Sequence, residues 1–185
     1  RPMKRPIIFL SLFSILFAQR PGDAAVRAGV DAFYNYEFDK SIEILSQARK
    51  DFPDHPGVHV TWAAAHWRRN EAYLPQDEIY SNLDANLDEI QKIYEDQLEK
   101  FPDHPEYMLY MGTAKGLDAR ILLGQKKWVP TLYAAFQGFR IIQKAFEKDP
   151  YLTDAYLPIG IVEYYAGLRY ISVQVATGML QLDVT

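Results

Sequence analysis

The sequence predicts an all-α fold, a helical-repeat solenoid of antiparallel helix pairs with three to four repeats. The heptapeptide at residues 50–56 recurs at 99–105, and a looser copy stands at 147–150. The prolines of these copies are 49 and then 48 residues apart. Before each copy, apolar residues recur every three or four positions, which is the spacing of one helical face. Self-similarity at such a period is typical of stacked repeats.

The second helix of each pair is marked by an apolar stripe that a proline ends. Proline lacks the amide hydrogen and clashes with the preceding turn, so it stops a helix. The stripes are Phe38, Ile42, Leu45 and Ala48; Ile79, Leu83, Leu87, Ile90, Tyr94 and Leu98; and Leu132, Ala135, Phe139, Ile142 and Phe146. The expected pairs are 22–35 with 37–51, 57–72 with 77–100, and 105–123 with 129–148, followed by a helix at 152–167.

Small residues mark the first helix of each pair. They stand at Ala28-Gly29, Ala63-Ala64, Gly112 and Gly160, and the last two are 48 residues apart. Glycine costs about 1 kcal/mol relative to alanine inside a helix, so its recurrence needs a packing reason. We therefore expect Gly112 and Gly160 to be positions where a paired helix comes too close for a β-carbon.

Residues 22–55 resemble the 34-residue unit of the tetratricopeptide repeat (TPR) family. Residues 36–41 are similar to its short turn, and the resemblance extends to about residue 167. The later repeats are about 48 residues long, roughly 14 more than the family unit. The positions that carry the resemblance are Ala25, Ala28, Gly29 and Ala32 in the first helix, and Ser41, Leu45, Ala48 and Pro53 in the second.

The resemblance implies a concave groove, lined by the first helices, that binds a protein or peptide segment. The lysine–asparagine clamp with which cytosolic members grip a chaperone's C-terminal carboxylate is missing from these positions, which fits an exported protein. The residues expected to face the groove are Phe33, Tyr34, Thr61, Ala65, Arg68, Glu106, Leu109, Thr113, Asp154, Leu157, Ile161 and Tyr164.

Residues 1–18 are expected to be a signal peptide. Met3 is followed by Lys4, Arg5 and an apolar run at 7–18, and a basic start before 7–15 apolar residues is a secretory pattern. Cleavage after residue 18 would leave a TPR-like domain at 19–185 that is periplasmic or secreted. The alternative is a buried first helix. No later segment reaches about 18 apolar residues, so no stable membrane span is expected after removal.

Composition excludes several classes of function. The chain has no cysteine, which excludes a disulfide scaffold, a thiolate zinc site and a cysteine nucleophile. Without the three basic residues of the signal segment, the balance is 17 basic to 24 acidic residues, a net charge of −7. Nucleic-acid partners are not expected, because affinity for phosphate needs a basic face.

No catalytic residues, cofactors or metal are expected. His55 and His59 have metal-ligand spacing, but the glutamate of the His-Glu-x-x-His motif is missing, and a turn role explains His55 and His104 better. Gly-x-Ser-x-Gly and a glycine-rich phosphate loop do not occur. The leading hypothesis is a non-catalytic, exported interaction module. A structural spacer is one alternative. Another is a small-ligand-binding or enzymatic protein with an aromatic-lined pocket, using His66, Arg68 and Glu163.

The C-terminal stretch 168–182 is apolar and is followed by no polar capping helix. Solenoid ends need a polar outer face, so the repeat domain is expected to be incomplete at this end. We expect residues 170–182 to cause self-association or to rest against the last helix pair, because a repeat cut in the middle leaves an apolar face open.

Overall fold

The computed structural model describes residues 20–164. The expected signal peptide and the apolar stretch at 168–182 lie outside the described residues. Within this part all regular elements are helical, which confirms the all-α prediction. The elements are α1 (Asp23–Tyr34), α2 (Phe38–Asp51), α3 (Val58–Tyr73), α4 (Gln76–Lys100), α5 (Pro105–Gly124), α6 (Trp128–Lys148) and the 3-10 turn η1 (Thr153–Ala155), after which 156–164 are helical.

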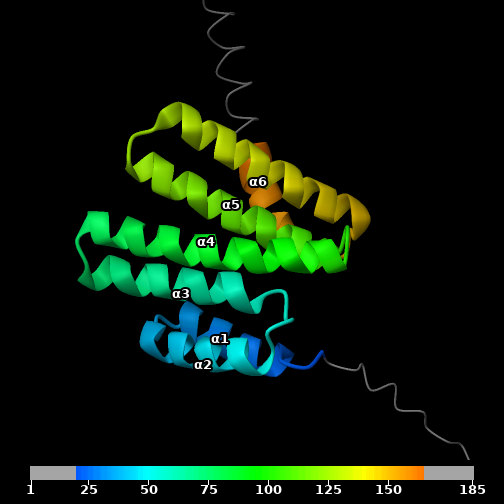
Figure 1. The fold of residues 1–185 in the computed structure, drawn as a ribbon, viewed down its shortest axis with the longest axis horizontal. Helices are drawn as coiled ribbons and strands as arrows, with labels where there is room; N and C mark the ends of the chain where they lie inside the picture. Colours follow the sequence, from blue (N-terminus) through cyan, green and yellow to red (C-terminus); the bar gives the residue numbers. More distant parts are fainter. Residues whose placement is uncertain (1–19, 165–185) are drawn as a thin grey trace, which may run out of the picture.

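The helices pack in pairs that follow the chain. Each helix contacts the one before and the one after it, and the pairs α1/α2, α3/α4 and α5/α6 stack in order across the molecule (Figure 1). This confirms the predicted packing of neighbouring helices. Among residues 20–164, none of the helices combines the length and the apolar content that a membrane crossing requires.

The first pair closes around a glycine. Gly29 of α1 lies against Leu45, and a β-carbon at this glycine would be 2.5 Å from the leucine side chain. The buried hydroxyl of Ser41 donates to the Gly29 carbonyl oxygen at 2.8 Å. Ala32, Leu45 and Ala48 are buried as predicted. The expectation is wrong for Ala28, which is exposed at the edge of the buried face of α1.

The repeated heptapeptide forms the loop between α2 and α3, and His55 has the turn role predicted for it. Its Nε2 is 2.9 Å from the Asp23 carboxylate, and its Nδ1 accepts the Gly57 amide hydrogen at 3.2 Å. Tyr107 of α5 donates its hydroxyl hydrogen to the Asp54 carbonyl at 2.7 Å. One earlier helix, α1, and one later helix, α5, therefore both hold this loop.

The backbones of α5 and α6 come close together at two glycines, Gly112 and Gly138. A β-carbon at Gly112 would be 2.7 Å from the Gly138 carbonyl oxygen and 2.7 Å from the Ile142 side chain. The predicted close approach is therefore confirmed at Gly112. At Gly160 no atom of the described part of the chain lies within 4 Å of a β-carbon built there, and the stretch 168–182 that was expected to begin the partner helix lies outside the described residues.

The stripe predicted for α6 is buried only in the second half of the helix. Ile142 is buried and Phe146 is partly buried, but Leu132 is 69% exposed and Ala135 is exposed. The side of α6 that faces α5 carries Gly138 instead. The first half of the stripe therefore lies on the same face of α6 as the buried second half, but no described residue covers it.

Candidate binding clefts

Two clefts of the described chain open to solvent. The first, which we call the α5 cleft, has a volume of about 190 Å³. The second, the Trp62 cleft, has a volume of about 350 Å³. The α5 cleft is lined by Glu106, Leu109, Tyr110, Asp149, Tyr151, Leu152, Thr153 and Asp154, and the Trp62 cleft by Ser46, Arg49, Lys50, Pro53, His59, Trp62 and Ile93.

The α5 cleft is built where the first turn of α5 meets the loop after α6. Pro105 occupies the first helical position of α5, where its missing amide hydrogen costs nothing, and Glu106 follows it. The Glu106 carboxylate forms a two-pronged ion pair with Arg20, whose Nη1 is 3.0 Å from Oε1. This pair joins residues 86 positions apart, so the start of α1 lies beside the start of α5.

The opposite wall of the α5 cleft comes from the segment around η1. The Asp154 carboxylate accepts the hydroxyl hydrogen of Tyr110 at 2.9 Å, and the Asp149 carboxylate accepts the amide hydrogen of Tyr151 at 2.9 Å. Burial raises the pKa of Tyr110, and the neighbouring charge of Asp154 raises it further. Tyr110 therefore stays protonated at physiological pH and remains a hydrogen-bond donor that positions Asp154.

The charge of the α5 cleft suits a cation. Three carboxylates line it, from Glu106, Asp149 and Asp154, and Arg20 compensates one of them. The ring of Tyr151 is 90% exposed beside them. Carboxylates and aromatic faces both attract guanidinium and ammonium groups. Among residues 20–164, no group of three or more histidine or acidic side chains is arranged to hold a metal ion.

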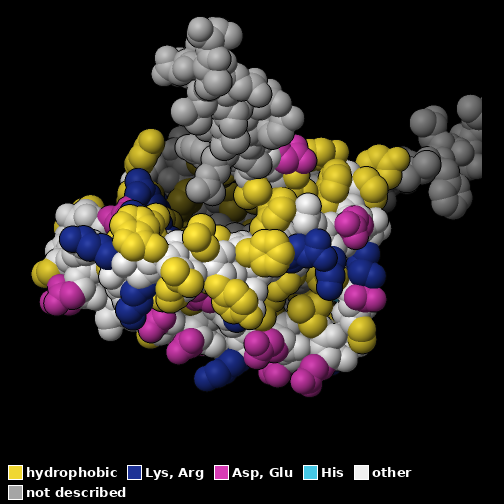
Figure 2. Space-filling view, turned by 90° about the horizontal axis from the view of Figure 1, so that it is seen from above, with side chains coloured by type: hydrophobic (Ala, Val, Ile, Leu, Met, Phe, Trp, Pro, Cys, Tyr) yellow, Lys and Arg dark blue, Asp and Glu magenta, His cyan; other side chains and the backbone are white. Residues whose placement is uncertain are grey.

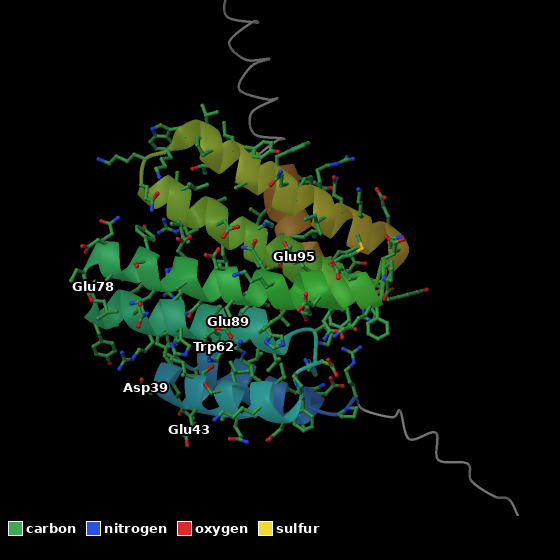
Figure 3. All side chains as sticks on the ribbon, viewed as in Figure 1. Asp39, Glu43, Trp62, Glu78, Glu89 and Glu95 are labelled. Carbon is green, nitrogen blue, oxygen red and sulfur yellow. The ribbon has the colours of Figure 1, made fainter. Side chains whose placement is uncertain are left out.

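In the Trp62 cleft the side chains of Ser46, Arg49, His59 and Trp62 already have partners within the protein. The guanidinium carbon of Arg49 lies 3.9 Å from the centroid of the Trp62 ring. Its Nε donates to Nδ1 of His59 at 3.1 Å, and its Nη2 donates to Glu89 at 2.6 Å. The indole of Trp62 donates to the Ser46 hydroxyl at 3.0 Å. Figure 3 shows Trp62 where α2 and α3 meet, so this network joins the first two helix pairs.

His59 is held neutral within that network. Its Nε2 donates to the Pro53 carbonyl oxygen, 2.8 Å away, while its Nδ1 accepts from Arg49. Burial lowers the pKa of His59, and the Arg49 charge lowers it further. Both ring nitrogens are occupied, so the imidazole serves structure and offers neither a metal ligand nor a base to a substrate.

The structure brings together only some of the residues expected in one groove. Glu106, Leu109 and Asp154 meet in the α5 cleft, although Leu109 is almost completely buried beneath it. Ala65 is in the core between the first two pairs and lines no open face. Thr61 and Thr113 turn their hydroxyls back onto carbonyls of their own helices. Phe33, Tyr34, Leu157, Ile161 and Tyr164 lie at other places on the molecule, outside both clefts.

The residues of the enzymatic alternative do not form a site in either cleft. Arg68 is paired with Glu71 on its own helix. The His66 ring packs 4.5 Å from the Trp62 ring, and burial lowers its pKa. Glu163 is exposed on the helical segment 156–164.

Sequence analysis missed Tyr110, Asp149 and Tyr151, which line the α5 cleft, and Arg20, which pairs with Glu106 beside it. The sequence did contain one sign of an acidic site, because Asp149 and Asp154 stand on either side of Pro150 at the end of the third repeat. No family model matches the chain, and no curated protein and no solved structure matches it. The interpretation of the clefts therefore depends on their geometry and charge.

Proposed function

We propose that the protein is a non-catalytic interaction module of TPR-like helix pairs that binds a protein or peptide segment carrying a lysine or arginine side chain. The observation that carries the proposal is the meeting of three carboxylates and an exposed tyrosine ring in the open α5 cleft. A cationic side chain placed there would gain charge-assisted hydrogen bonds and contact with an aromatic face.

The shape of the cleft supports binding of an exposed side chain over turnover of a small molecule. Ligand pockets of enzymes are typically concave spaces of about 300–1,000 Å³ that enclose most of the ligand. The α5 cleft is about 190 Å³ and open to solvent, which is enough for one side chain of a longer segment. The signal-like pattern at residues 3–18 supports a periplasmic or secreted location for this module.

Selection from a displayed library of random 12-residue peptides tests the proposal. Peptides enriched on the wild-type protein are expected to share a basic residue. Their affinity, measured with synthetic peptides, is expected to fall at least about tenfold in Asp154→Asn, since one charge-assisted hydrogen bond contributes roughly 1.5–3 kcal/mol. Asparagine can still accept the Tyr110 hydrogen bond, so the substitution removes the charge and keeps the geometry.

Glu43→Gln is the matched control. Glu43 is an exposed carboxylate on α2 at the opposite edge of the array from α6 (Figure 3), so its loss should leave peptide affinity unchanged. The proposal fails if the enriched peptides lack basic residues. It also fails if they bind Asp154→Asn and Glu106→Gln as tightly as they bind the wild type.

A further inference from the structure

The first half of α6 carries an apolar surface that no described residue covers. We call it the α6 patch, and it is visible in Figure 2, which looks down on the side of the molecule where α6 lies. Its side chains are 62 to 78% exposed. The second to fifth of them come one, four, five and eight positions after Trp128, so all five share one face of the helix. The α6 patch consists of Trp128, Val129, Leu132, Tyr133 and Phe136.

The second half of the same helix is covered by the chain that follows it. Leu152 and Ala155 are buried in one cluster with Ile142 and Ala145, and Ile159 packs against this cluster. The Tyr156 ring contacts the Phe146 ring with centroids 5.2 Å apart. The chain after α6 therefore turns back over the end of α6, and its described part ends at residue 164 in helical conformation.

The junction between α4 and α5 shows how the start of a second helix becomes covered. Tyr80, the fifth residue of α4, lies under the end of α5. Arg120 Nη1 is 3.4 Å from its hydroxyl oxygen, and a β-carbon at Gly124 would be 2.2 Å from its ring. Arg120 and Gly124 come 15 and 19 residues after the first residue of α5.

The same spacing, applied to α6 and the helical run that follows it, indicates which residues would cover the start of α6. Leu132 is the fifth residue of α6, and the next helical run begins at Thr153, which is 48 residues after Pro105. Positions 15 and 19 residues after Thr153 are Leu168 and Ser172. A helix rises 1.5 Å per residue, so a run of about 20 residues from Thr153 has the length of α6.

We propose that residues 165–175 of this chain cover the α6 patch, with Leu168, Ile171 and Ser172 nearest to Leu132. The segment has the required chemistry, since its only charged residue is Arg169. Ala166 and Gly167 are small enough to pass close to the large rings of the patch. In this proposal the C-terminal segment completes the first helix of a fourth pair. This role does not depend on peptide binding in the α5 cleft.

Thiol labelling in the full-length chain tests the proposal, and the natural absence of cysteine makes every introduced thiol unique. Leu132→Cys is expected to react with a maleimide at least tenfold more slowly than Glu43→Cys, because labelling follows exposure. Adding Ile171→Asp to Leu132→Cys should raise the rate towards that of the control. Circular dichroism confirms that each variant is still helical.

Three results would overturn the proposal. Equal rates for the two single cysteines would show that the α6 patch is open. Slow labelling of Leu132→Cys that speeds up on dilution would show that a second copy covers it. Slow labelling that Ile171→Asp and Leu168→Asp leave unchanged would show that another part of the chain covers it.

Discussion

The hydroxyl group of Tyr94 donates its hydrogen to the Pro56 carbonyl oxygen at 2.7 Å and accepts the Val60 amide hydrogen at 3.1 Å. Tyr94 lies on α4 and is completely buried. Val60 is in the first turn of α3, where amides have no partner within the helix. The Tyr94 hydroxyl therefore ties the loop between α2 and α3 to helix α4.

Tyr94→Phe should lower the free energy of unfolding by about 1–3 kcal/mol, because it leaves a buried carbonyl and a buried amide unpaired. Urea denaturation followed by circular dichroism measures the change. Tyr34→Phe is the control, since Tyr34 is exposed and the substitution keeps its ring. If both variants have the wild-type midpoint, the Tyr94 hydroxyl does not stabilise the loop.

Gly112→Ala should destabilise the protein, whereas Gly160→Ala should not. The β-carbon at Gly112 meets the Gly138 backbone, which cannot move aside cheaply, so we expect a loss of about 1–3 kcal/mol. The position at Gly160 is open among the described residues. Alanine there should be neutral or stabilise by about 0.5–1 kcal/mol through helix propensity. Thermal melts of the two variants in parallel measure this, and equal shifts would contradict the assigned packing.

Arg49→Met should destabilise the junction of the first two helix pairs. The substitution keeps much of the side-chain volume but removes the donor to His59 and the ion-pair partner of Glu89. We expect a cost of about 1–3 kcal/mol, the usual penalty for unpaired, partly buried polar groups. Lys50→Met is the control, because this neighbour is exposed. A similar urea midpoint for both variants would mean that the Trp62 network contributes little.

Stability should fall as the pH drops below about 6.5, the ordinary pKa of histidine. Burial lowers the pKa of His59 and of His66 in the folded protein, so the unfolded chain binds more protons in this range. Unfolding then becomes easier as pH falls through the unfolded-state value. Urea midpoints at pH 7.5 and 5.5 measure the loss, which should be smaller in His59→Gln. A variant with the full wild-type loss would exclude His59 as a source.

Local pattern was sufficient to predict the helices and several of their contacts. Proline ends and apolar spacing placed each helix within a few residues of its observed bounds, because these signals act over one or two turns. The same holds for the turn before α2, which begins at Phe38, and for the buried Ser41, Leu45 and Ala48. The recurring small residue also identified Gly112 correctly.

The contacts between residues far apart in the sequence were decided only by the tertiary structure. Gly160 matches Gly112 in repeat position, yet no described helix approaches it. Ala65 and Leu109 were expected on an open face but are buried. The sequence pattern shows which residues share a helix face, but it does not show which neighbouring helix covers that face. The α5 cleft depends on the Arg20–Glu106 pair across 86 residues and on Tyr110 meeting Asp154 across 44. Such contacts depend on the exact way in which one helix pair lies against the next, and the local spacing of apolar residues does not specify which distant polar side chains meet there.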